Sequence, residues 1–151
     1  VQKVHPYRLD AFSSGDAGPI GFVEEGQVRW TAHAWDSTPI ILNAMQLPEA
    51  TAWPYVDIIL NHAGADGRVV NALLQAGVQG LVVAGTGNGT VSSALQAALL
   101  KAQSAGVRVV LASRCPQGRV IACANEPWAL ALNSNPVKAR VDLLLSLMNS
   151  P

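Results

Sequence analysis

A glycine-studded turn with a single asparagine is the stretch of this chain best suited to binding a ligand. It spans residues 85–90 (GTGNGT) and follows an apolar run at residues 81–84. Asn88 carries the only side chain of the turn with both an amide donor and a carbonyl acceptor. Glycines on either side let a backbone or ligand approach closely, because no Cβ stands in the way. We therefore predict a ligand contact by Asn88, in a loop shaped by Gly85, Gly87 and Gly89.

The same glycines do not complete a nucleotide-binding motif. In the dinucleotide fingerprint the third glycine stands one residue later, where this chain has Thr90. That fingerprint also needs an acidic residue about 20 residues further on, and Ser113 and Arg114 occupy that region. A phosphate-binding P-loop would continue with Gly-Lys-Ser or Gly-Lys-Thr, and neither follows.

The other reactive side chains are scattered along the chain. Cys115 and Cys123 have no further Cys or His at the spacing of a metal site, so we expect structural or free thiols and no bound metal. His5, His33 and His62 have no nucleophile paired with them, and we expect a structural role for His62. The residues alone thus predict a ligand-binding loop with no catalytic group and no cofactor.

The glycine turn belongs to a repeated strand–helix pattern. Residues 76–83 resemble residues 105–111, each reading as a helix end, a glycine and a buried strand. Residues 55–61 predict a further strand before them. Strands joined by helix-length crossovers are parallel. We predict an α/β fold: a three-layer αβα arrangement around a flavodoxin-like or Rossmann-like parallel sheet of about four strands, in the order 2-1-3-4, with helices on both faces.

Shorter patterns predict details of this domain. Asp66 is expected as the N-cap of a first helix, and Asn135 followed by a proline as the N-cap of the last one. Short strands are expected at residues 119–122 and 128–132. The buried stripe expected on the last helix consists of Val137, Val141, Leu144, Leu145 and Met148.

Residues 1–50 differ from the remainder. Residues 20–23 and 27–30 predict a β-hairpin with its turn at residues 24–26. From residue 31 to residue 54 the hydrophobic residues follow no helix or strand periodicity, and the segment contains three prolines, which is typical of a linker. We place a boundary near Thr51 and expect a hairpin and linker at 1–50 before the α/β domain at 51–151.

Composition excludes two classes of partner. Ten basic residues balance ten acidic ones, so no net field attracts nucleic acid or an anionic membrane. No uninterrupted apolar stretch reaches the roughly 20 residues of a membrane helix. Charged residues make up only 13% of the chain, which favours a surface covered by another domain or subunit.

Four blocks in sequence resemble the carboxyl-terminal domain of bacterial L-asparaginases, the asparaginase/glutaminase family. They are the glycine turn at 85–89, the SRCPQG segment at 113–118, the GPIG segment at 18–21 and the NPVKAR segment at 135–140. Each block alone is weakly specific, but their order and spacing also resemble the family. The resemblance covers nearly the whole chain.

The resemblance implies hydrolysis of asparagine, and often glutamine, to the acid and ammonia without metal or cofactor. It places the nucleophilic threonine in an amino-terminal domain, and neither a Thr-Gly-Gly-Thr nor a Gly-Thr-Asp-Thr motif occurs here. No catalytic residue is therefore expected in this chain, and the chain alone is expected to be inactive. The implied partners are that amino-terminal domain and further copies of the protein, as a dimer or tetramer, in the cytoplasm or the periplasm.

Two substrate contacts, with three candidate residues, follow from the resemblance. Asn88 matches the asparagine that reaches into a neighbouring subunit's active site. A family glutamate that contacts the substrate's amino group falls on Asn125, with Glu126 one residue later. The segment between Pro127 and Asn135 is shorter than in the periplasmic enzymes, so either residue could take that role. Two alternatives remain: Asn88 could only cap the following helix, and the chain could be a non-catalytic binding or interaction module of flavodoxin-like fold.

Overall fold

The computed structural model describes residues 1–15, 18–31, 48–132 and 134–149. The chain divides into two compact units, Val1–Pro39 and Ile40–Pro151. The linker expected at residues 31–54 lies mostly outside the described residues. No helix of the described part is both long and apolar enough to cross a membrane.

The first unit is built from two small antiparallel pairs. Strand β1 (Gln2–Lys3) pairs with β2 (Phe12–Ser13), and β3 (Gly21–Glu24) pairs with β4 (Gln27–Trp30). The second pair confirms the predicted hairpin. Its turn has positive φ angles at both central residues, Glu25 (49°) and Gly26 (79°), as tight hairpin turns require.

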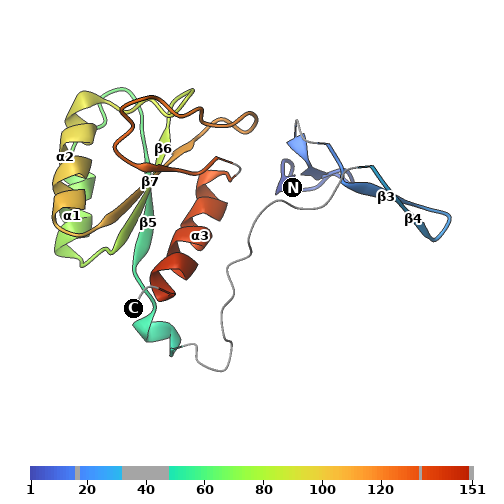
Figure 1. Ribbon diagram of the computed structural model, residues 1–151, viewed down its shortest axis with the longest axis horizontal. Coiled ribbons are helices and arrows are strands. Elements are labelled where there is room, and N and C mark those ends of the chain that lie inside the picture. The colour runs from blue at the N-terminus through green and yellow to red at the C-terminus, as the bar shows by residue number, and fades with distance from the viewer. Residues whose placement is uncertain (16–17, 32–47, 133, 150–151) are drawn as a thin grey trace. The chain divides into compact units, whose positions relative to one another are not determined.

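The second unit contains one parallel sheet (Figure 1). Its strands are β5 (Val56–Leu60), β6 (Gly80–Gly85), β7 (Arg108–Ser113) and the short β8 (Ala129–Leu130), and every neighbouring pair is parallel. A 3₁₀ turn, η3 (Ala50–Ala52), precedes β5. The predicted α/β fold and the parallel pairing of the first two strands are confirmed.

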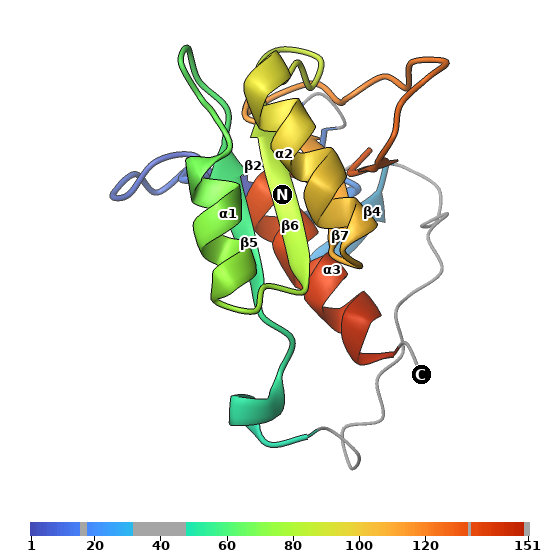
Figure 2. The same ribbon diagram turned by 90° about the vertical axis from the view of Figure 1, so that its left-hand side faces the viewer.

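The predicted strand order is wrong. The strands lie in sequence order, β5-β6-β7-β8, rather than 2-1-3-4. Helices α1 (Arg68–Gln75) and α2 (Ser93–Ser104) both cover the same face of the sheet, and α3 (Pro136–Met148) covers the other (Figure 2). Right-handed crossovers that place both helices on one face must add each new strand on the same side. The order would have reversed only if α1 and α2 lay on opposite faces.

The two faces carry separate hydrophobic cores. The first lies between the sheet and helices α1 and α2, and includes Val70, Leu81, Leu95, Leu99 and Leu111. The second lies between the sheet and α3. Strand β6 is buried along its whole length because both cores lie against it. This central strand leads directly into the glycine turn and so gives the turn a rigid base.

The stripe predicted on α3 is also wrong in part. Val137 and Val141 are exposed, while Ala139 and Leu143 are buried. The reason is Gly80: a Cβ there would lie 2.9 Å from a methyl of Leu143 and 3.1 Å from one of Leu147. Because Gly80 has no side chain, Leu143 and Leu147 pack closely against β6, and the side of α3 that carries them faces the sheet.

Two helix N-caps were predicted, and one of them forms. The side chain of Asn135 accepts a hydrogen bond from the Lys138 amide, with Pro136 opening α3, as expected. Helix α1 instead begins after Gly67, without a side-chain cap. Asp66 lies one residue too early, and its carboxylate accepts a hydrogen bond from the Arg68 amide at 3.0 Å.

Candidate functional site

Three loops leave the carboxyl ends of β5, β6 and β7, and because the strands are parallel these ends lie at one edge of the sheet. The β5 loop covers residues 61–67, the β6 loop residues 86–92, and the β7 loop residues 114–128. We call this edge with its three loops the carboxyl edge. It is where open α/β sheets place their ligands.

The glycine turn of the β6 loop closes on itself. Thr86 and Thr90 exchange two backbone hydrogen bonds, of 3.0 and 2.8 Å, around the three residues between them. Gly85 is required because a Cβ there would lie 2.6 Å from the Gly89 carbonyl carbon. Gly89 has φ of +87°, and a Cβ on it would lie 2.9 Å from a methyl of Leu111. The turn is therefore packed closely against β7.

Asn88 is exposed, and its amide group pairs with the backbone of Ile121. Its Oδ1 accepts from the Ile121 N–H at 2.6 Å, and its Nδ2 donates to the Ile121 carbonyl at 3.2 Å. Helix α2 is capped by Ser92, whose hydroxyl accepts from the Leu95 amide, so the view of Asn88 as a helix cap is wrong. One N–H and one lone pair of the Asn88 amide remain for a further contact.

The strand predicted at residues 119–122 does not form. The segment includes Ile121, and its N–H and carbonyl are bound by the Asn88 amide rather than by a neighbouring strand. A side-chain amide can satisfy a donor and an acceptor on one residue in this way. The β7 loop is thus attached to the tip of the glycine turn.

Sequence reasoning missed Asn61, a residue of the β5 loop that hydrogen-bonds to both the β6 loop and the β7 loop. It is the one buried polar residue of the described part, at 5% exposure. Its Nδ2 donates to the Thr90 carbonyl and its Oδ1 accepts from the Ser92 amide, both at 3.1 Å. Its carbonyl accepts from Nη1 of Arg114 at 3.2 Å. A lone asparagine at the end of a buried strand was the only signal in the sequence.

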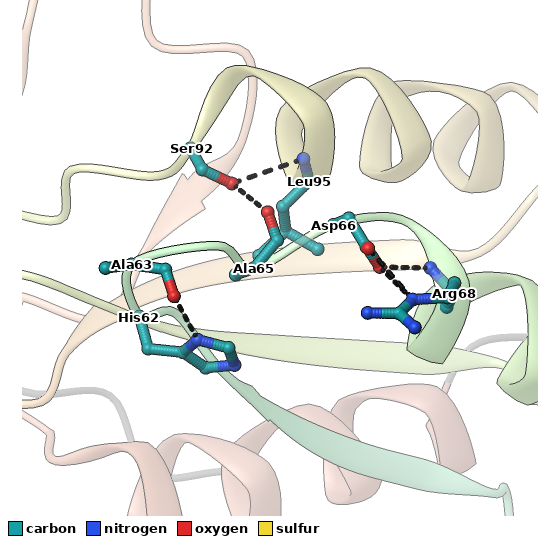
Figure 3. A network of polar contacts seen from close by, with 7 residues as sticks. All are labelled: His62, Ala63, Ala65, Asp66, Arg68, Ser92 and Leu95. Atoms are coloured by element: carbon teal, nitrogen blue, oxygen red, sulfur yellow. Dashed lines mark hydrogen bonds and ion pairs between the residues drawn. The ribbon is translucent and has the colours of Figure 1, made fainter.

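Ser92 and Ser113 complete the contacts between the loops. The Ser92 hydroxyl donates to the Ala65 carbonyl at 2.6 Å, which ties the start of α2 to the β5 loop (Figure 3). The Ser113 hydroxyl donates to the Gly87 carbonyl, also at 2.6 Å, and accepts from the Cys115 amide. Each of the three loops is therefore hydrogen-bonded to the other two.

A cavity of about 350 Å³ lies beside the β5 loop. Its walls are mostly apolar, and His62, Asp66 and Arg68 supply its polar groups. Nδ1 of His62 lies 2.8 Å from the Ala63 carbonyl oxygen, which can only accept a hydrogen bond, so Nδ1 is the donor in this contact (Figure 3). Hydrogen bonds from the Arg68 amide and guanidinium lower the pKa of Asp66 below its ordinary value of 3.8. Among the described residues, no group of three His, Cys, Asp or Glu side chains could hold a metal ion.

Comparison with known proteins identifies the family. The family described as the glutaminase/asparaginase C-terminal domain matches residues 55–150. The chain belongs to this family.

Relatives and a solved structure agree with the assignment to this asparaginase family. The chain is 33% identical to the glutaminase-asparaginase of Pseudomonas fluorescens biotype A, over 97% of this chain and 42% of that protein. It is also 33% identical to a probable periplasmic L-asparaginase of Haemophilus influenzae, with coverage of 97% and 43%. The crystal structure of a probable cytoplasmic L-asparaginase from Campylobacter jejuni matches with a TM-score of 0.81 and 30% identity, over 99% of this chain and 46% of that chain. The chain thus spans less than half the length of these relatives.

The two other residues expected to contact substrate lie in the β7 loop of this asparaginase-family domain. Asn125 is exposed and Glu126 is half-buried, and the Glu126 amide donates to the Cys123 carbonyl in a turn. This turn follows Ile121, the partner of Asn88, by a few residues. Cys115 and Cys123, in the same loop, are both free and exposed. No described contact joins Asn88 directly to Asn125 or Glu126.

Proposed function

We propose that this chain is the carboxyl-terminal portion of an asparaginase-type amidohydrolase, which converts asparagine or glutamine to the acid and ammonia. The observation that carries the proposal is the family match over residues 55–150, together with an exposed Asn88 at the carboxyl edge. The chain's part in the reaction is to bind and orient substrate. The threonine nucleophile belongs to an amino-terminal domain that this chain does not include.

The proposed contacts have distinct chemistry. Asn88 offers an uncharged donor and acceptor, which suits a carboxamide or carboxylate of the substrate. Glu126 would bind the substrate ammonium through a charge-assisted hydrogen bond, whereas Asn125 could offer only a neutral one. A charge-assisted bond is roughly twice as strong, so the residue that occupies this position affects substrate affinity.

The subunit arrangement is part of the proposal. Asn88 is exposed, and only 13% of the residues are charged, which favours a surface covered by another subunit. We place Asn88 at an interface of a dimer or tetramer, where it completes a site whose nucleophile another subunit supplies. Relatives carry the words periplasmic and cytoplasmic in their names, and these are the two compartments proposed for this protein.

Ammonia release tests the proposal. The purified 151-residue chain is expected to release none from asparagine or glutamine, because amide hydrolysis without a metal needs a nucleophile activated by a neighbouring base, and we expect no such pair in this chain. The full-length protein that contains this chain is expected to hydrolyse at least one of them. Turnover by the isolated chain, free of full-length enzyme, would refute the division of roles. A full-length protein that binds but hydrolyses neither amide would favour a non-catalytic binding module.

A second assay separates the two candidates for the ammonium contact. In the full-length protein, Glu126→Gln is expected to raise KM for asparagine about tenfold if Glu126 makes the charged contact. Asn125→Ala serves as the comparison. If only Asn125→Ala raises KM, the neutral contact is the functional one.

A further inference from the structure

The hydrogen bonds of the carboxyl edge form a closed circuit around Asn61. From its side chain the circuit runs to Thr90, through the glycine turn to Gly87, and on to Ser113. The next residue, Arg114, donates back to the Asn61 carbonyl. The tip of that turn is Asn88.

The geometry points to Asn61 as a positioning residue for Asn88, an inference that rests on the proposed function. Asn61 contacts both ends of the segment that leads from the turn into α2, through the Thr90 carbonyl and the Ser92 amide. The backbone N–H of Asn61 donates to the Ala84 carbonyl at 3.0 Å, which fixes Asn61 to the end of β6. The turn is thus held from its base, and Asn88 has a defined position relative to the sheet.

Burial makes this role sensitive to small changes. At 5% exposure, Asn61 is shielded from water, so groups that lose it as a partner cannot readily bind solvent instead. The Thr90 carbonyl still accepts from the Thr86 amide, so the turn can close without Asn61. A substitution of Asn61 would instead free the turn from its fixed position relative to β5.

Asn61→Asp separates the two hydrogen bonds of this side chain. An ionised carboxylate keeps an acceptor for the Ser92 amide but places a second acceptor against the Thr90 carbonyl. A protonated carboxyl can donate to that carbonyl again. Burial raises the pKa of such a carboxyl and the neighbouring Arg114 guanidinium lowers it, so the pH at which the carboxyl takes up its proton is the pH at which Asn61→Asp is expected to regain activity, on a limb absent from the wild type.

A double-mutant cycle in the full-length protein tests the inference. Asn61→Ala is expected to lower kcat about five- to tenfold in the wild-type background. In the Asn88→Ala background the same substitution is expected to change kcat by less than about twofold, because the residue through which it acts is already gone. Asn71→Ala, at an exposed asparagine on α1, is the matched control and should leave kcat unchanged in both backgrounds.

Hydrogen exchange of the Ile121 amide gives a readout that does not depend on activity. This N–H donates to Asn88, so it should exchange about tenfold faster in Asn61→Ala, while amides in β6 keep their protection. If Asn61→Ala speeds the exchange of the Ile121 amide but the wild-type full-length protein hydrolyses neither asparagine nor glutamine, the proposed function is refuted and the positioning role is not. Unchanged Ile121 exchange, or an equal loss of kcat in both backgrounds, would overturn the inference. A lower melting temperature with unchanged kcat would overturn it as well.

Discussion

Replacing Gly89 with alanine tests the packing of the glycine turn against β7. The residue has φ of +87°, a conformation that costs an L-residue about 1–2 kcal/mol. The new Cβ would also lie 2.9 and 3.2 Å from two Leu111 side-chain atoms and 3.3 Å from Val120. Overpacking of this kind typically costs about 1–3 kcal/mol. We expect Gly89→Ala to lower the free energy of unfolding by about 2–5 kcal/mol.

The same turn supplies the control. Gly87 also has a positive φ, of +51°, but a Cβ there would meet nothing within 4 Å. Gly87→Ala should therefore cost only the conformational part, about 1–2 kcal/mol. Urea unfolding, followed by circular dichroism and by tryptophan fluorescence, to which the buried Trp128 contributes, measures the difference between the two variants. Equal losses in both variants would show that the close approach of Gly89 to Leu111 does not restrict the turn.

Three further predictions concern other contacts. Ser92→Ala should lower the free energy of unfolding by about 1–2 kcal/mol, because it removes the cap of α2 and the hydrogen bond to the Ala65 carbonyl. Ser93 is exposed on the first turn of α2, so Ser93→Ala should cost little. Equal effects of the two substitutions in urea unfolding would contradict the cap. Arg140→Met should cost about 1–3 kcal/mol in the same assay, because the Arg140 Nε bond to the Val56 carbonyl on the edge strand is lost, and no loss would show that water replaces it. The lowered pKa of Asp66 implies a stabilising contribution that is present above its unfolded pKa and lost as the pH falls through the folded one. An NMR titration should place its midpoint below 3.8, and a midpoint at or above that value would contradict the bonds from Arg68.

The sheet was predictable because its signals are local. Buried apolar runs followed by glycine-capped helices predict parallel strands wherever they occur, and β5, β6 and β7 follow that pattern. The strand order was not predictable in the same way. It depends on which face of the sheet α1 and α2 cover, and the repeated pattern is the same for either face.

The candidate site shows the same limit. The glycine turn could be found because glycine and asparagine have strong local preferences. The pairing of Asn88 with Ile121 joins residues 33 positions apart, and no local pattern predicts it. Asn61 was missed because its role depends on contacts to two other loops. The facing side of α3 likewise depends on Gly80, a residue of a distant strand. The roles of Asn125 and Glu126 stay predictions from family resemblance.

Subunit complementation tests the central claim most directly, namely that this chain supplies Asn88 to a site whose nucleophile comes from another subunit. One full-length variant would carry Asn88→Ala, and a second would lack the nucleophilic threonine proposed for the amino-terminal domain. Each is expected to have little activity alone. Mixed oligomers should regain asparagine hydrolysis, because some sites then combine an intact nucleophile with an intact Asn88. Mixed oligomers that form but show no ammonia release above that of the two variants alone would contradict the account.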